Sequence, residues 1–151
     1  MLRAPDTMVE SLLRMKWFSD ESLNNISWLH QSKKAPYIPF FVPKEDIQNW
    51  EKSNELERCC YYYNLMYKNI RDEEATIIDY DEFVKNPSVK FNKLTKHLGL
   101  KNGEMTNSLL ENIYTDRISK KHSNNLIPKD TYENMMNVYH SVLERDIEFN
   151  I

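Results

Sequence analysis

Hydrophobic residues recur along most of this chain at the three- and four-residue spacing of an amphipathic helix. The pattern predicts helices over about residues 6–17, 45–71, 87–98 and from 128 onward, with shorter helical stretches after Ser19 and near 103–113. The longest stripe comprises Leu56, Cys60, Tyr63, Tyr67 and Ile70, which fall on one helical face. We therefore expect a mostly helical chain in which helix 45–71 packs on at least one side.

One segment departs from the helical period. Residues Ala75 to Tyr80 are short, β-branched and flanked by charge, which is typical of a strand, and residues 1–4 read as a strand stub. Helix–strand–helix order implies a parallel sheet covered on both faces. One strand of about 75–80 and one stub do not complete a sheet. The prediction is an α/β fold, with residues 1–151 as a single partial domain, the C-terminal part of a P-loop-type three-layer domain.

The start of the first helix carries candidate chemistry. Pro5 suits a first helical turn, and Thr7 and Glu10 are spaced as a capping box. Arg3 precedes this turn and Ser11 follows in the second turn, so both could face an anion near the helix N-terminus. Taken alone, the same residues also fit a surface arginine and an ordinary helical serine.

Two further segments leave alternatives open. Prolines at 36, 39 and 43 alternate with apolar residues over 32–44, which predicts an extended, ordered loop. Such a loop either forms a substrate wall or packs over the core. Four tyrosines lie between 61 and 67, and we interpret them as core and interface packing rather than as a stacking platform for bases or sugars.

Composition excludes several function classes. Only 2 glycines among 151 residues argue against a glycine-rich phosphate cradle. A net charge of −3 gives no general attraction to nucleic acid or to acidic membranes, so basic residues must act locally. Cys59 and Cys60 diverge on a helix, which predicts two reduced thiols, no disulfide and no metal site. No stretch reads as a membrane segment or a signal peptide, which predicts a cytoplasmic protein.

The run from Ile77 through Asp81-Glu82-Phe83 to Asn86-Pro87, followed by Leu98-Gly99-Leu100, resembles the sulfotransferases that use 3′-phosphoadenosine 5′-phosphosulfate (PAPS). That family has a strand ending in Tyr-Glu-Asp-Leu, then Asp-Pro, then a helix closing on Leu-Gly-Leu. Its Leu-Arg-Asn-Pro motif, followed by a helical serine, is similar to Leu2-Arg3-Ala4-Pro5 with Ser11. The resemblance covers most of the chain and implies PAPS as co-substrate, with its 3′-phosphate held by Arg3 and Ser11.

The same resemblance makes the basic stretch near Arg117, Lys120 and Lys121 a candidate loop over the nucleotide, about as well explained as a solvated loop. Departures are Ala4 before the proline, Asp81 after the tyrosine, and the absence of the family's Arg-Lys-Gly signature. The family's first phosphate loop and its catalytic base have no counterpart here. We therefore assign no catalytic residue, expect an incomplete or inactive chain, and expect no sulfuryl transfer from this chain alone.

The function predicted from sequence is thus that of a sulfotransferase-like chain, whose full relative would transfer sulfuryl from PAPS to a hydroxyl or amine of a small-molecule or glycan acceptor. The alternative is a non-enzymatic helical protein-interaction module on a remnant of that scaffold. In that case a protein partner would cover the edge left by the missing strands. A remnant of a P-loop kinase is a third, weaker alternative. Nucleic acid is not an expected partner.

Overall fold

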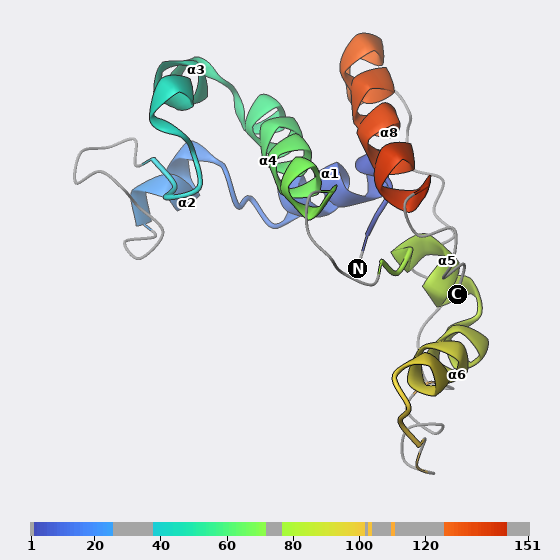
Figure 1. Ribbon diagram of the computed structural model, residues 1–151. Helices are drawn as coiled ribbons and strands as arrows, with labels where there is room; N and C mark the ends of the chain where they lie inside the picture. Colours follow the sequence, from blue (N-terminus) through green and yellow to red (C-terminus); the bar gives the residue numbers. More distant parts are fainter. Residues whose placement is uncertain are drawn as a thin grey trace.

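The computed structural model describes residues 2–25, 38–71, 77–101, 103, 110 and 126–144. These residues form α1 (Pro5–Arg14), α2 (Asp20–Asn25), the short 3-10 helix η2 (Lys44–Asp46), α3 (Ile47–Lys52), α4 (Glu55–Arg71), α5 (Tyr80–Lys85), α6 (Pro87–His97) and α8 (Lys129–Leu143). Figure 1 shows α1, α4 and α8 side by side, with α2 and α3 beyond one end of this group and α5 and α6 beyond the other.

The core lies where α1, α4 and α8 pack pairwise. Val9 of α1, Tyr63 of α4 and Met135 of α8 are at most 1% exposed. Each fully buried side chain of this size contributes roughly 1.5–3 kcal/mol by removal of apolar surface from water. Burial of Cys60 and Tyr67, with Leu56 and Ile70 packed against the core, confirms the stripe predicted for helix 45–71.

The predicted α/β fold is wrong. The described residues contain no β-strand and no sheet; Leu2 and Asp79 form one isolated parallel bridge, and residues 75 and 76 of the predicted strand lie outside the described part. The extended backbone stops because Asp79 is already the cap of a helix. Its Oδ1 accepts hydrogen bonds from the Asp81 and Glu82 N–H groups, and α5 begins at Tyr80. The predicted three-layer domain with strand 75–80 and stub 1–4 is replaced by a helical assembly.

The expected helix 45–71 is divided at Ser53 and Asn54. Asn54 and Glu57 form a reciprocal capping box, in which the Glu57 N–H donates to Asn54 Oδ1 and the Asn54 N–H donates to Glu57 Oε2. This cap satisfies N–H groups that a continuous helix would have bonded within itself. The sequence signal for the break, an asparagine three residues before a glutamate, was present at Asn54-x-x-Glu57.

The first helix also differs from expectation at both ends. Pro5 occupies the first turn as predicted, but Ala4 is the N-cap and makes no side-chain cap, while Thr7 Oγ1 donates to the Ala4 carbonyl instead. The helix ends at Arg14 because Lys16 adopts a left-handed φ of 53°. The Lys16 and Trp17 N–H groups then bond back to the Leu13 and Leu12 carbonyls. This is the closure that glycine usually makes.

The C-terminal elements follow the sequence prediction. Pro87 opens α6, and Gly99, with φ of +67°, ends the turn that follows it. Pro128 is the N-cap of α8, whose Met135, Tyr139 and Val142 are buried. Most of the helix predicted near 103–113 lies outside the described residues.

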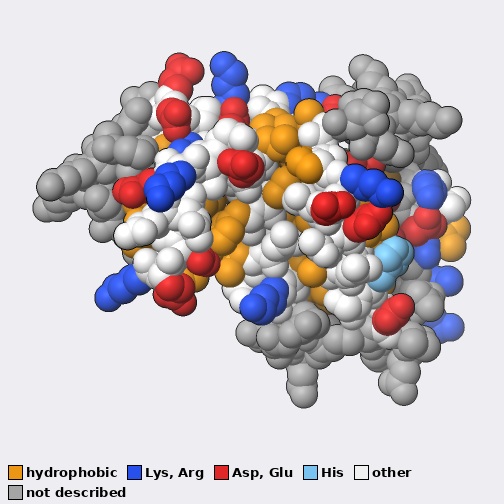
Figure 2. All heavy atoms as spheres, turned by 90° about the horizontal axis from the view of Figure 1, so that it is seen from above, with side chains coloured by type: hydrophobic (Ala, Val, Ile, Leu, Met, Phe, Trp, Pro, Cys, Tyr) orange, Lys and Arg blue, Asp and Glu red, His pale blue; other side chains and the backbone are white. Residues whose placement is uncertain are grey.

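The described part of the proline-rich loop packs over the core. Ile38, Pro39 and Val42 are buried, while Phe40 points outward and is 65% exposed. Figure 2 shows hydrophobic side chains running across the middle of one face, between acidic and basic groups.

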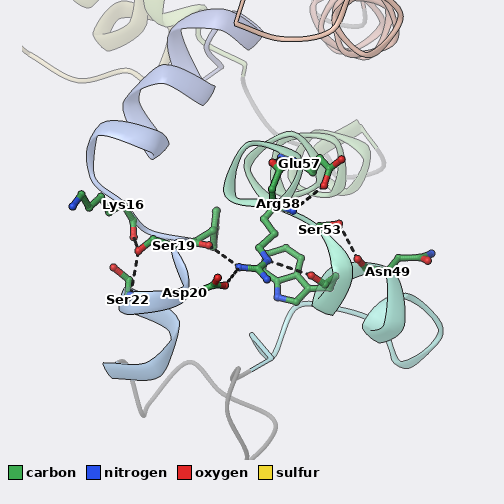
Figure 3. Close-up of polar contacts among 11 residues, drawn as sticks. Lys16, Ser19, Asp20, Ser22, Asn49, Ser53, Glu57 and Arg58 are labelled. Carbon is green, nitrogen blue, oxygen red and sulfur yellow. Dashed lines mark hydrogen bonds and ion pairs between the residues drawn. The ribbon is translucent and has the colours of Figure 1, made fainter.

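Arg58 ties the outer helices to α4 (Figure 3). It is 3% exposed; its Nε–H donates to the Trp50 carbonyl, and Nη1 donates to the Phe18 carbonyl and, at 2.6 Å, to Asp20 Oδ1. The guanidinium carbon lies 5.8 Å from the centre of the Trp50 ring. One buried cation thus joins the turn before α2, the end of α3 and the start of α4. The sequence offered no sign of this role.

Candidate anion site at Arg3

Arg3 lies in the extended segment that leads into α1. On one side this segment pairs with residues 78–80: the Leu2 N–H donates to the Ile78 carbonyl at 2.7 Å, and the Tyr80 N–H donates to the Leu2 carbonyl at 2.6 Å. Leu2 itself is 1% exposed. The parallel bridge therefore fixes the backbone immediately before the arginine.

Tyrosine hydroxyls from α4 bond the other side of the segment. The Arg3 N–H donates to Tyr67 Oη at 2.8 Å, and the Tyr67 and Tyr63 hydroxyls each donate to the Arg3 carbonyl at 3.1 Å. Both backbone groups of Arg3 are satisfied as a neighbouring strand would satisfy them. Hydroxyl groups of α4 thus take the place of a neighbouring strand at Arg3. The extended segment around the Leu2–Asp79 bridge is therefore hydrogen-bonded at Arg3 without a further strand.

The same tyrosines remain neutral over the physiological range. Burial raises the pKa of Tyr67 to about 12, and burial also raises the pKa of Tyr63 far above its ordinary value. Their rings meet edge to face, with centroids 4.1 Å apart. The sequence interpretation of Tyr63 and Tyr67 as packing residues agrees with their burial. It did not predict that their hydroxyls bond the backbone of Arg3.

The side chain of Arg3 is held by a ring and lacks one partner. Its guanidinium carbon lies 4.3 Å from the centroid of the Tyr80 ring, a cation–π contact. Its Nε is buried and has no hydrogen-bond partner. A buried donor left without a partner costs roughly 1–3 kcal/mol. An acceptor oxygen placed at this nitrogen would recover that free energy.

Asp81 is a carboxylate that interacts with Arg3, and Asp79 and Asp6 interact with Asp81 in turn. Asp81 Oδ2 accepts the Ala4 N–H at 2.9 Å, and Asp79 Oδ2 accepts the Tyr139 hydroxyl at 2.8 Å. Burial raises the pKa of Asp81, and the charges of Asp79 and Asp6 raise it further, while the Ala4 N–H and Arg3 act in the opposite direction. The Asp81 carboxylate is thus hydrogen-bonded to the backbone of Ala4, and the Asp79 carboxylate to the Tyr139 hydroxyl. The described residues contain no ion pair to Arg3 within contact distance.

Ser11, the second predicted phosphate contact, lies in the second turn of α1 and is partly buried. It stands roughly 9 Å along the helix axis from Pro5, at 1.5 Å per residue. Arg3 lies in the extended segment before α1 and Ser11 lies within the helix, so the structure brings only Arg3 to the N-terminal end of α1. Within the described residues, no hydrogen bond joins the side chains of Arg3 and Ser11.

The remaining predicted contacts, Arg117, Lys120 and Lys121, lie outside the described residues. Among the residues that are described, no group of histidines, cysteines and carboxylates is arranged to hold a metal ion. Cys59 and Cys60 are free and buried, and burial raises the pKa of their thiols to about 12 and about 11. None of the described helices has the length and apolar composition of a membrane span.

Comparisons of this chain with protein-family models, with curated proteins and with solved structures found no match.

Proposed function

We propose that this chain holds the 3′-phosphate of PAPS at Arg3, with Ser11 as a second contact further along α1. In the full relative that the resemblance implies, PAPS would supply the sulfuryl group for transfer to a hydroxyl or amine acceptor, whereas this chain alone is expected to bind without transferring it. The observation that carries the proposal is the buried Nε of Arg3, which lacks a hydrogen-bond partner in a residue that closely precedes a ten-residue helix. The proposed role of Arg3 does not depend on the sheet that the sequence predicted.

Two features favour an anion at this point. The Ala4 N-cap has no side-chain cap, and the N-terminal end of α1 carries the positive end of the helix dipole. The Tyr80 ring and the Tyr63 and Tyr67 hydroxyls fix both ends of Arg3, so little side-chain entropy remains to be lost on binding. A charge-assisted bond from arginine to phosphate contributes roughly 1.5–3 kcal/mol.

The neighbouring carboxylates oppose this binding. Asp81 places a negative charge near the Arg3 guanidinium, and Asp79 and Asp6 add negative charge near Asp81, so this local charge lowers the affinity for an anion. Replacing Asp81 by asparagine keeps an oxygen for the Ala4 N–H and removes one charge. The proposed site therefore predicts opposite effects from two substitutions, Arg3→Ala and Asp81→Asn.

Calorimetry with adenosine 3′,5′-bisphosphate and adenosine 5′-monophosphate tests the site directly. The wild-type chain should prefer the bisphosphate by at least about tenfold, which corresponds to the weaker end of one arginine–phosphate bond. Arg3→Ala should abolish that preference and Asp81→Asn should increase it. Arg14→Ala, at the exposed opposite end of α1, is the matched control and should leave it unchanged. Equal affinity for both nucleotides in the wild type, or a preference that survives Arg3→Ala, contradicts the proposal.

A second candidate, a helical protein-interaction module, is favoured by a different region. Met15, Trp17 and Phe40 are 54%, 46% and 65% exposed. They belong to neighbouring segments, because Phe18 and Phe41 contact each other with ring centroids 6.0 Å apart. Substituting serine for Trp17 and Phe40 together should abolish partner binding if this module is the function, without altering the nucleotide preference.

A further inference from the structure

One segment of this acidic chain carries basic residues without any acidic residue. Residues 83–101 contain 5 lysines, 1 histidine and no aspartate or glutamate. Because the whole chain carries −3 and this segment carries +5, the remaining residues carry −8. Such asymmetry within one chain indicates a local partner of opposite charge rather than a general preference for anions.

The structure places this segment at the outside of the molecule. It comprises the end of α5, all of α6 and the turn after α6, and α6 packs chiefly against α5, away from the α1, α4 and α8 core (Figure 1). Lys93 and Lys96 are exposed and share a helical face with Val89. Lys85 forms an ion pair with Glu82. We therefore consider the lysines toward the C-terminal end of α6 as the candidates for contact with a partner.

Exposed leucines stand beside these lysines. Leu98 and Leu100 are 53% and 60% exposed, on either side of Gly99 in the turn that closes α6. An added Cβ at Gly99 would meet no atom within 4 Å, so this turn is open on its outer side. Lys96 and Lys101 flank the turn and are exposed as well. Exposed leucines and exposed lysines therefore lie together at one corner of the chain, formed by the C-terminal end of α6 and the turn after it.

We propose that this corner binds the surface of an anionic lipid bilayer. The Leu98 and Leu100 side chains enter the boundary between headgroups and acyl chains, while Lys93, Lys96 and Lys101 reach the lipid phosphates and carboxylates. The binding is peripheral and depends on charge complementarity. It is independent of the nucleotide site at Arg3.

The leucines decide between a bilayer and a soluble polyanion. A polyanion in water would contact the lysines but would leave Leu98 and Leu100 exposed to water. It would therefore gain no free energy from burial of apolar surface. A bilayer rewards both features at once, since its interface is charged at the surface and apolar just beneath. The combination in one turn therefore favours the lipid surface.

Co-sedimentation with vesicles tests the proposal. The chain should bind vesicles of phosphatidylcholine containing about one-third phosphatidylserine, should not bind pure phosphatidylcholine, and should be released by about 0.5 M salt. Replacing both Lys93 and Lys96 by glutamate should weaken binding at least about 25-fold, because each lysine near an anionic surface is worth about fivefold. Replacing both Lys44 and Lys52 by glutamate, at exposed positions on other elements, is the matched control and should retain binding.

A double variant, Leu98→Ser with Leu100→Ser, distinguishes an anionic bilayer from a soluble polyanion as the partner. This variant should lose several-fold in vesicle affinity while its binding to heparin stays unchanged. If the leucine pair leaves vesicle binding unchanged while the lysine pair abolishes both vesicle and heparin binding, the partner is a soluble polyanion and the lipid proposal is overturned. Absence of binding to anionic vesicles, or equal binding to neutral ones, overturns it too. Circular dichroism of each variant confirms that these exposed positions leave the helices intact.

Discussion

Arg58 and Arg3 both carry guanidinium groups that are partly or wholly withdrawn from water, yet their hydrogen bonds differ. Arg58 is 3% exposed, and it donates to two backbone carbonyls and to Asp20. Arg3 rests on the Tyr80 ring, and its buried Nε has no partner. The backbone of Arg3, in contrast, is fully bonded by Tyr63 and Tyr67.

The difference separates two uses of a buried cation. Desolvating a guanidinium is costly, so a chain that fills its donors with carbonyl and carboxylate oxygens uses it to join elements of the fold. A guanidinium that is held in place with one donor unfilled contributes less to the fold and offers that donor to a ligand. Arg58 belongs to the first kind, and the proposed role of Arg3 depends on its belonging to the second.

Arg58→Met should produce the largest loss of stability. The substitution keeps much of the apolar stem but removes the donors that link the Phe18 and Trp50 carbonyls to α4. We expect the free energy of unfolding to fall by about 3 kcal/mol, measured by urea denaturation, since hydrogen bonds from a charged group contribute roughly 1.5–3 kcal/mol. Asp20→Asn is the control and should cost less than about 1 kcal/mol, because that side chain is 76% exposed. A loss for Arg58→Met no larger than that of the control would remove Arg58 from its linking role.

Tyr67→Phe should have the next largest effect, because it removes the hydroxyl that bonds both the N–H and the carbonyl of Arg3. We expect a loss of about 1–2 kcal/mol in unfolding free energy. Tyr63→Phe is a matched comparison and should cost less, since the Arg3 carbonyl would keep its bond to Tyr67. Equal losses for the two variants would show that burial of the rings, not the bonds to Arg3, determines the effect.

Local patterns predicted much of the helical framework. The ends of α6 and the face of α8 depend on prolines, one glycine and a run of regularly spaced apolar residues, all of which act within a few positions. The division between α3 and α4 had the same kind of local signal in Asn54 and Glu57, but the long apolar stripe outweighed it in the sequence interpretation.

The sheet and the two arginine environments could not be predicted in the same way. An extended run becomes a strand only if neighbouring segments supply ladder partners. Here Ile78 and Tyr80 bond to Leu2, while the carbonyl of Arg3 is bonded by Tyr63 and Tyr67, which lie 60 and 64 positions later in the sequence. Arg58 likewise bonds Phe18, 40 positions earlier. Such partners depend on packing of distant elements, which hydrophobic spacing does not specify.

A smaller effect is expected from Asp81→Asn, read as a change in pH dependence. Because the pKa of Asp81 is raised in the folded state, the folded chain binds this proton more tightly than the unfolded chain. The associated stability is present below the ordinary pKa of an aspartate and is lost as pH rises through the raised value. Asp81→Asn should flatten this part of the curve of unfolding free energy against pH. A curve unchanged in Asp81→Asn, with Asp130→Asn on α8 as control, would mean that another group titrates there.

The smallest effect is expected from Arg3→Met, and it tests the comparison most sharply. The substitution loses a cation–π contact with Tyr80, worth about 0.5–1 kcal/mol, but it also removes a buried donor that has no partner. These terms oppose each other, so the unfolding free energy should change by less than about 1 kcal/mol, against about 3 kcal/mol for Arg58→Met. A loss of 2 kcal/mol or more, on the order of a broken charged hydrogen bond, would show that the Arg3 guanidinium already has a partner in the fold. Arg3 would then be a linking residue like Arg58, and the unfilled donor that supports phosphate binding would not exist.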